Sequence, residues 1–436
     1  MTIHRKRNKN LGLAELIAIA LGGMVGGGIF TILGISVSMI GNLTPIAIII
    51  GGFIASLAAY SYVKLGLYYK DEGATYSFYK LTYPKSRFSA SVVGWFIIFG
   101  YISTLALYAY TFASYAISST EFADNIWIRK AIAIGVIGIF TLINIWSVNG
   151  MGKIEDLMVY TKLVVLTIIS VILMQHGSSS FGTFIENMAL DAGKSSVFSI
   201  LIVASMTFVA FEGFQLVINA VNEMTNPQKN IPRAIYSAII LAIIIYVVIA
   251  MGALIAIPTE EIIKNKEYAL AAGAGNILGS IGTNLVILGA ILATSSAISG
   301  TVFGSSRQMS VIAEDGYFPN WLAIRKNNSP KNAIIAMAVL ASILILIGGL
   351  QLILEFGSIT FMLVSLLMSI ANYKIRSKTN SSRILTAFSI FGLSFGGILI
   401  LYYEFTNKWQ QMLAIILLYV LLTFGAWMYT KKEISK

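Results

Sequence analysis

Five glycines, Gly22, Gly23, Gly26, Gly27 and Gly28, are the residues of this sequence whose spacing first indicates chemistry, in the stretch GGMVGGGIF. Each glycine inside a helix costs about 0.5–1 kcal/mol relative to alanine, so the stretch predicts a helix break. A phosphate-binding turn would need a preceding strand, and LAELIAIAL carries no strand signal. Irregular backbone within an apolar span persists only where it is buried in protein or lines a cavity. We therefore expect a binding site here.

A second interruption follows in SMTFVAFEGFQLVINA, where Glu212 and Gly213 stand between aromatic residues. An acid within an apolar span usually faces a cavity or a partner. The amides of Gly26–Gly28 would attract an anion, because a helix start carries partial positive charge. Carbonyl groups near Met24, Val209 and Glu212 would lack helical partners and suit an ammonium group. Together the breaks suit a zwitterion; the alternative is that the glycines only permit close helix packing.

Phe208, Phe211 and Phe214 flank the second break. One of them would close over a bound substrate, and Phe208 and Phe211 are the candidates because they adjoin the break. The alternative is an ordinary buried or lipid-facing aromatic side chain. The carboxyl group of Glu212 either carries a proton or stays protonated as a structural hydrogen-bond donor.

Lys162 is a lone cation in MVYTKLVVLTIISVILM, six residues beyond Asp156. That places it about 9 Å into a helix, at 1.5 Å per residue. The side chain either extends to the membrane interface or points inward, where it could load and release a proton. Thr294, Ser295 and Ser296 offer hydroxyl groups that could bind sodium or accept a hydrogen bond from Lys162, or that bond to the carbonyl four residues back.

The composition sets these residues in a membrane protein. Of 436 residues, 57% are hydrophobic and 11% are charged, and the mean hydropathy is +0.81, which excludes a soluble globular domain. Cysteine is absent and only His4 and His176 are histidines, so we expect no metal, no cofactor and no enzyme activity. No cleavable signal peptide is expected. The net charge of +11 is explained by loop asymmetry rather than by a nucleic-acid partner.

Breaks at charged and proline residues divide the chain into twelve predicted transmembrane spans. They are 13–40, 45–66, 91–119, 130–148, 157–175, 197–221, 233–257, 281–304, 333–354, 356–373, 384–404 and 409–429. With both termini cytoplasmic, 23 Lys and Arg residues fall inside and 6 outside. This asymmetry favours a multi-pass protein of the cell membrane in that orientation.

The first and sixth spans, both interrupted, hold corresponding places in two sets of five. Because an odd number of spans separates their starts, the second set runs upside down relative to the first. The chain is therefore predicted as all-α, with repeat 1 at about 13–175 and repeat 2 at about 197–375. Two extra helices at 384–430 and short tails at 1–12 and 431–436 complete it.

Four motifs resemble the amino acid–polyamine–organocation (APC) superfamily over roughly residues 11–375. GGMVGGGIF resembles its G-x-G-[IV]-F signature, and FVAFEGFQLVINAVNEMTNPQKNIPRAI its sixth helix and following loop. AYSYVKLG with EGATYSFY is similar to its second helix, and SSRQMSVIAEDGYFP to the end of its eighth. The resemblance implies a LeuT-like inverted-repeat core with broken helices 1 and 6. It also implies substrate carboxylate at Gly26–Gly28 and carbonyl contacts from Met24, Val209 and Glu212.

KIEDLMVYTKL further resembles the fifth helix of archaeal proton-coupled, broad-specificity amino acid transporters, in which a lysine occupies the place of a sodium ion. Lys162 falls on that position and Gly22 on its neighbour. The resemblance thus implies proton coupling and argues against sodium, since the lysine would repel a second cation.

The sequence thus predicts a secondary transporter that imports amino acids, mainly neutral ones, by proton symport with alternating access. Its partners would be the amino acid, protons and the lipid bilayer, and its oligomeric state is left open. Predicted substrate-binding residues are Met24, Gly26, Gly27, Gly28, Phe208, Val209, Phe211 and Glu212; predicted proton-coupling residues are Lys162, Gly22 and Ser295. The alternatives are an exchanger or sodium symporter, and a non-transporting sensor or accessory subunit.

Overall fold

A computed structural model describes residues 11–71, 73–146, 151–175, 180–265, 267–326 and 329–434, without the side chains of 151–158, 276–278 and 432–434. Of the predicted tail at 1–12, only Leu11 and Gly12 are among the described residues, and the end of the tail at 431–436 lies outside them. His4 and His176 also lie outside.

Helices account for nearly all of the regular structure. The first half of the chain forms α1 (Leu13–Met24), α2 (Gly28–Ile40), η1 (Gly41–Leu43), α3 (Thr44–Tyr69), α4 (Ala74–Thr82), α5 (Arg87–Ile117), α6 (Ile126–Trp146) and α7 (Met151–Gln175). The second half forms α8 (Phe181–Lys194), α9 (Val197–Met206), η2 (Thr207–Phe211), α10 (Leu216–Asn219), α11 (Pro227–Ala256), α12 (Thr259–Lys264), α13 (Ala269–Glu314), η3 (Asn320–Leu322), α14 (Lys331–Ile347), α15 (Leu350–Lys374), α16 (Arg376–Thr379), α17 (Arg383–Asn407) and α18 (Trp409–Ile434). The described residues contain no β-strand beyond two isolated bridges.

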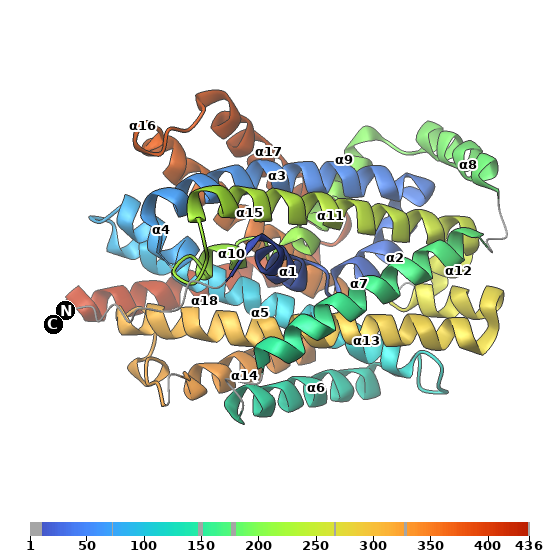
Figure 1. Cartoon of the computed structure of the whole chain (residues 1–436), viewed down its shortest axis with the longest axis horizontal. Coiled ribbons are helices and arrows are strands. Elements are labelled where there is room, and N and C mark those ends of the chain that lie inside the picture. The colour runs from blue at the N-terminus through green and yellow to red at the C-terminus, as the bar shows by residue number, and fades with distance from the viewer. Residues whose placement is uncertain are drawn as a thin grey trace.

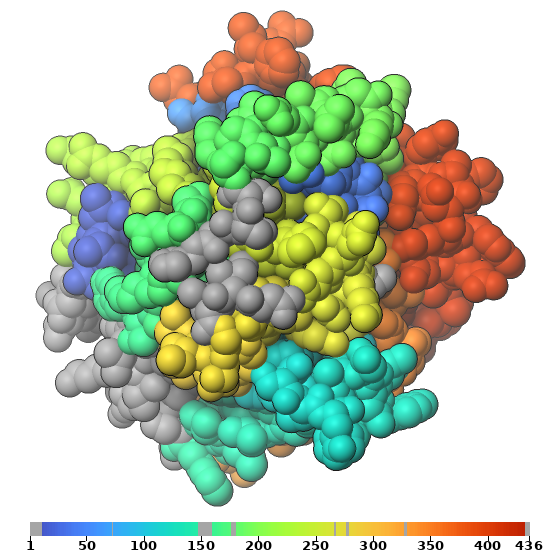
Figure 2. All heavy atoms as spheres, turned by 90° about the vertical axis from the view of Figure 1, so that its right-hand side faces the viewer, coloured from blue at the N-terminus to red at the C-terminus, as the bar shows by residue number. Residues whose placement is uncertain are grey.

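The long helices lie side by side along the longest axis of the molecule (Figure 1). We call the end of the bundle that carries α4 and α16 the α4 end, and the opposite end, with α8 and α12, the α8 end. Figure 2 looks onto the α8 end, where α8 lies across the face of the bundle. The described chain thus forms one bundle with two ends capped by short helices.

Length and composition identify the bundle as membrane-spanning. Within the described residues, nine helical segments are long and apolar enough to cross a bilayer, and three apolar helices are shorter: Leu13–Met24, Val159–Gln175 and Lys331–Ile347. The peripheral helices also expose large apolar side chains, such as Phe391 on α17 and Leu417 on α18. Exposed apolar side chains are stable against the hydrocarbon tails of lipids but not against water. Together with the apolar spans, they identify the chain as a multi-pass membrane protein.

Both predicted helix breaks are confirmed. The first predicted span, 13–40, is divided between α1 and α2 at residues 25–27. The sixth, 197–221, is divided into α9, η2 and α10. Regular helical hydrogen bonding stops at the glycines of the first break and at the Glu212–Gly213 pair of the second break. The low helix preference of glycine explains both interruptions.

The predicted boundary between the ninth and tenth spans is wrong. The sequence placed it at Glu355, but α14 ends at Ile347 and α15 begins at Leu350, with Gly348 and Gly349 between them. Glu355 is fully buried inside α15, where Nε2 of Gln351 donates to its Oε1 at 2.6 Å. A glycine pair ends a helix more effectively than a carboxyl group that has partners.

Candidate substrate and coupling site

The first break exposes the start of α2 to the centre of the bundle. α1 ends at Met24, and Gly27 caps α2, which begins at Gly28. The amide of Gly26 donates to the carbonyl oxygen of Met24 at 2.9 Å, so the chain turns sharply there. The first amides of α2 have no carbonyl partner within their own helix. Such a helix start can hold an anion.

The second break is a tight turn followed by extended backbone. In η2, the carbonyl oxygen of Val209 accepts from the amide of Glu212 at 3.2 Å. Gly213 then adopts a φ of +124°, a conformation that side chains disfavour. The break therefore needs glycine at this position.

The two breaks contact each other through their backbones. A Cβ atom added to Gly213 would lie 2.6 Å from the carbonyl carbon of Gly23. One added to Gly28 would lie 3.0 Å from Cβ of Ala210. Only the absence of side chains lets the two segments approach so closely.

Two tyrosine hydroxyl groups fix this crossing. The hydroxyl of Tyr246, on α11, lies 2.7 Å from the carbonyl oxygen of Met24 and 2.8 Å from that of Ala210. The hydroxyl of Tyr108, on α5, donates to the carbonyl oxygen of Gly23 at 2.9 Å. Tyrosine hydroxyl groups thus lie against the carbonyl oxygens of Gly23, Met24 and Ala210, which the helix breaks leave without helical partners. The carbonyl of Val209 has a donor as well, the amide of Glu212.

The glycine triplet is tightly enclosed. A Cβ atom on Gly26 would lie 2.7 Å from Cβ of Ala297 and 2.8 Å from a ring carbon of Tyr108. One on Gly27 would lie 2.9 Å from Oγ1 of Thr111. The glycines therefore do permit close packing, and in this arrangement none of the three is among the residues that line the nearby cavity.

Glu212 lies beside a small cavity below the crossing. Its Oε2 accepts from Nε2 of Gln215 at 2.6 Å, whereas its Oε1 has no hydrogen-bond partner in the described part of the chain. The cavity measures about 10 Å³, and its other lining residues include Tyr101, Thr104, Tyr108, Thr301, Ser305 and Phe361. That volume is about what one water needs, so an amino acid requires the site to open.

The phenylalanines of the second break are fully buried. The ring of Phe211 lies 5.4 Å from that of Tyr246 and does not line the cavity, and neither does Phe208. The rings that line the cavity with Glu212 are instead those of Phe361 on α15, Tyr101 and Tyr108, and Phe361 packs edge-on against Tyr101 at 5.5 Å. Phe361 and the tyrosines were not among the residues predicted from the sequence. A tyrosine within an apolar span was the available signal, because its hydroxyl needs a partner.

Lys162 points into the bundle. Its side chain is fully buried, and Nζ lies 3.1 Å from the carbonyl oxygen of Gly22, one turn before the first break. A Cβ atom on Gly22 would lie 3.2 Å from Val159, so α1 and α7 are in close contact here. The lysine therefore does not extend to the membrane interface, and it touches the helix that carries the glycine triplet.

A hydroxyl group of α13 also contacts the lysine. Oγ of Ser296 lies 3.5 Å from Nζ of Lys162, and Ser295, its neighbour in the chain, is buried. Oγ1 of Thr294 donates back to the carbonyl of Ala290 at 2.6 Å. Of the three predicted hydroxyls, Thr294 thus bonds within its own helix. Across the residues that the structure describes, no three His, Asp or Glu side chains form a metal site.

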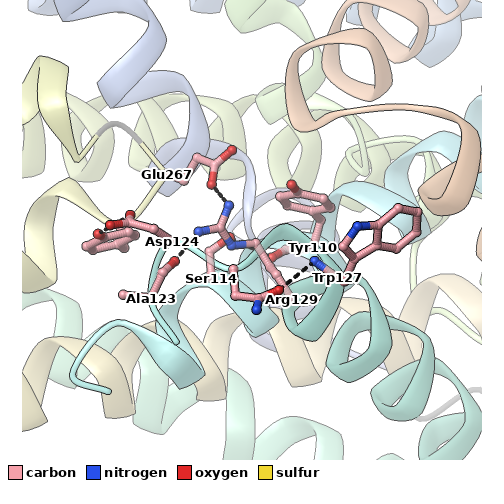
Figure 3. A network of polar contacts seen from close by, with 9 residues as sticks. Tyr110, Ser114, Ala123, Asp124, Trp127, Arg129 and Glu267 are labelled. Carbon is pink, nitrogen blue, oxygen red and sulfur yellow. Dashed lines mark hydrogen bonds and ion pairs between the residues drawn. The ribbon is translucent and has the colours of Figure 1, made fainter. Parts of the chain in front are cut away.

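A polar network ties the α8 end together (Figure 3). The guanidinium group of Arg129 is buried and contacts the carboxylate of Glu267 and the carbonyl of Ala123. The hydroxyl of Tyr268 donates to Asp124 at 3.2 Å, and burial together with this carboxylate raises the pKa of Tyr268. These contacts hold the α5–α6 connection against the segment before α13.

The α4 end is held by a matching set of contacts. The hydroxyl of Tyr76 donates to Oδ2 of Asp315 at 2.7 Å, and Nζ of Lys80 lies 2.7 Å from the other oxygen. Burial, and then Asp315, raise the pKa of Tyr76 well above its ordinary value. Leu11 and Met224 also form a bridge beside α10. Polar contacts therefore join neighbouring segments at both ends of the bundle.

Comparison with known proteins places the chain in a family. The family model described as amino acid permease matches residues 11–426. An uncharacterized protein of Methanocaldococcus jannaschii is 27% identical over 92% of this chain and 91% of its own. The inner membrane transport protein YbaT of Escherichia coli is 27% identical over 86% of each chain. The chloroplastic cationic amino acid transporter 7 of Arabidopsis thaliana is 24% identical over 79% of this chain and 62% of its own.

The match spans both helix breaks, Lys162 and the contacts at both ends of the bundle. The resemblance to the APC superfamily is thereby confirmed, and the permease family and the transporter-named relatives indicate a transporter and not an enzyme. This chain belongs to the amino acid permease family and is a membrane transporter.

Proposed function

We propose that this chain imports neutral amino acids of small to medium size by proton symport with alternating access. The observation that carries the proposal is the contact between Nζ of Lys162 and the carbonyl oxygen of Gly22, at 3.1 Å in a fully buried environment. A buried ammonium group that touches the substrate-binding helix can couple its protonation to the position of that helix.

The coupling follows from the geometry of α1. Protonated Lys162 holds Gly22 against α7, and the glycine triplet follows Gly22 by one turn. Loss of the proton removes the positive charge and weakens this contact. The protonated form would favour the outward-facing state and the deprotonated form the inward-facing state, so proton flux would drive the exchange between them.

The crossed breaks would bind the substrate. The amides at Gly26–Gly28 would take its carboxylate, and carbonyl groups of Met24, Val209 and Glu212 its ammonium group. In the closed arrangement Tyr246 holds the carbonyl of Met24, so its hydroxyl would move aside when substrate enters. When the site opens, Gly27, which has no side chain, and the neighbouring Phe208 and Phe211 would leave room only for a small apolar side chain.

Cationic amino acids are the specific alternative. Oε1 of Glu212 has no partner among the described residues, Glu212 lines the small cavity, and one relative is named a cationic amino acid transporter. A binding screen over the common amino acids separates the two: lysine and arginine competing better than alanine or leucine would overturn the neutral preference.

The proposed topology has twelve transmembrane helices, a LeuT-like core of two inverted repeats, and both termini in the cytoplasm. The 23 to 6 division of Lys and Arg residues supports this orientation in the plasma membrane. The α4 end would then face the cytoplasm and the α8 end the outside.

Uptake into proteoliposomes under a pH gradient tests the mechanism, with no sodium and no internal substrate. Symport predicts accumulation of labelled amino acid that an ionophore for protons abolishes. Uptake that needs internal substrate indicates an exchanger, and uptake that needs sodium indicates a sodium symporter. Binding without flux indicates a sensor or accessory subunit. Each of these three results would overturn proton symport.

A further inference from the structure

A second group of buried charged side chains lies at the α8 end, on helices that the proposed substrate site does not use. Glu355, in the second turn of α15, and Glu404, in the last turn of α17, are both fully buried and interact through their carboxyl groups. Nζ of Lys408, just past α17, lies 3.7 Å from Oε1 of Glu355. Gln351 donates to the same oxygen at 2.6 Å.

Three of the four carboxyl oxygens of Glu355 and Glu404 accept no hydrogen bond from the described residues. Within the described residues, both carboxyl oxygens of Glu404 and Oε2 of Glu355 are buried without a partner. An ionised carboxylate in that situation is strongly disfavoured, and two ionised carboxylates that face each other are worse. One proton shared by the pair supplies the missing donor and removes the repulsion.

The charges balance with one proton. Two carboxylates and the ammonium of Lys408 sum to −1, and one bound proton makes the group neutral. The phenol of Tyr403 is the other titratable group in contact, 5.6 Å from Nζ of Lys408 at its ring centre. Lys130 of α6 also reaches this end, but its Nζ donates to the carbonyl oxygen of Leu346.

Charged side chains on the helices packed against α15 and α17 lie elsewhere. On α3, α5, α14 and α18 they are at the α4 end: Lys64, Arg87, Lys331 and Lys431. Tyr419 of α18 bonds to Thr360, farther along α15. Among the described side chains on these helices, Lys408 is therefore the charged group beside the pair.

We propose that Glu355 and Glu404 form a carboxyl pair that binds one proton at the α8 end, separate from Lys162, and that α15 transmits its charge state to the second break. The ligand is the proton, and Lys408 sets how tightly it is held. The pair could thus sense pH on the side of the membrane that the α8 end faces.

The link to the second break is short. The hydroxyl of Ser358 donates to the carbonyl oxygen of Met206 at 2.8 Å, directly before η2. A Cβ atom on Gly357 would lie 3.3 Å from Val209. Both residues are within one turn of Glu355, so a shift of α15 on charging the pair reaches the predicted substrate carbonyls.

Infrared difference spectroscopy tests proton binding without any transport step. Protein in nanodiscs should show a protonated-carboxyl band at neutral pH that Glu404→Gln removes. The measurement is made in a Glu212→Gln background, because Glu212 is also buried. Glu314→Gln, on a half-exposed carboxylate, is the matched control and should leave the band unchanged. A band that survives Glu404→Gln would overturn the site.

A second variant keeps the test decisive if Glu404→Gln folds poorly. Lys408→Met should keep the band to higher pH by about one pH unit or more, because a positive charge favours the ionised form. No shift would overturn the role of Lys408. In proteoliposomes, Glu404→Gln should also flatten the dependence of uptake on pH at the α8 end. If Glu404→Gln removes the infrared band but leaves the pH dependence of uptake unchanged, the proposal that α15 transmits the charge state to the second break is overturned. Neither infrared result bears on proton symport through Lys162.

Discussion

The hydroxyl of Tyr246 lies 2.7 Å from the carbonyl oxygen of Met24, and this one bond joins α11 to the break between α1 and α2. The same hydroxyl lies 2.8 Å from the carbonyl oxygen of Ala210, in η2. A single phenol therefore holds both helix breaks together in the closed arrangement. Opening of the site must disrupt this contact.

Tyr246→Phe should loosen the crossing. The carbonyl oxygens of Met24 and Ala210 lose the one hydroxyl hydrogen that they share, at about 1–3 kcal/mol, so thermal unfolding in detergent should begin a few degrees lower. Amino acid uptake should fall as well. Tyr402→Phe, on an exposed ring of α17, is the control and should change neither. Equal stability of the two variants would contradict a structural role for the Tyr246 hydroxyl.

Lys162→Ala should abolish accumulation driven by a pH gradient while substrate binding, measured by thermal shift or calorimetry, changes less than about tenfold. The reason is that Lys162 contacts Gly22 and not the glycine triplet itself. Lys85→Ala, on an exposed side chain, should accumulate substrate normally. Gradient-driven accumulation that persists in Lys162→Ala would remove the lysine from the coupling mechanism.

Gly26→Ala should abolish binding. The new methyl group would lie 2.7 Å from Ala297 and 2.8 Å from the ring of Tyr108, so the break must shift. Gly138→Ala is the matched control, because nothing lies within 4 Å of a Cβ at that position of α6. It should be neutral, or stabilise by about 0.5–1 kcal/mol through helix propensity. Normal binding by Gly26→Ala would show that the triplet tolerates side chains and carries no ligand.

Arg129→Met should open the α8 end, because it removes the buried guanidinium group that contacts the partly exposed Glu267 carboxylate and the carbonyl of Ala123. The chain contains no cysteine, so a single Ser114→Cys, at a buried position beside Arg129 in Figure 3, can report access by maleimide labelling. Labelling should rise several-fold in Arg129→Met and stay at the parent level in Lys130→Met, whose half-buried side chain donates to the carbonyl oxygen of Leu346. Equal labelling of both would contradict a closing role for Arg129.

Tyr76→Phe should open the α4 end in the same way, since Asp315 loses a donor at 2.7 Å. Burial and Asp315 raise the pKa of Tyr76, so the phenol stays protonated below its ordinary value of 10.0 and its stabilising contribution is lost only at more alkaline pH. Labelling of a single Ser305→Cys should therefore be independent of pH across the neutral range in the parent, and higher in Tyr76→Phe. A phenol that ionised near neutral pH would instead make the parent pH-dependent.

The sequence by itself determined where the first and sixth spans break, and it singled out Lys162 and Glu212 as charged residues within apolar spans. Glycine and Glu212–Gly213 disfavour helix locally, and local preference needs no partner to act. The apolar spans follow from the bilayer in the same way. The sequence suggested a span boundary at Glu355 because a carboxyl group is costly within an apolar span. One of the partners that allow it to be buried, Lys408, follows α17 and is distant in the sequence, so the local pattern could not reveal it.

Only the tertiary structure decided which groups satisfy the breaks. The hydroxyl of Tyr246 comes from α11, 222 residues from Met24 in the sequence, and that of Tyr108 comes from α5, 85 residues from Gly23. No local sequence pattern can pair groups so far apart. The inward direction of Lys162 depends on α1 packing against α7, and the ring beside Glu212 belongs to Phe361 on α15. Hydrogen bonds between distant segments exist only after packing brings the helices together, which is why the sequence could indicate the breaks but not their partners.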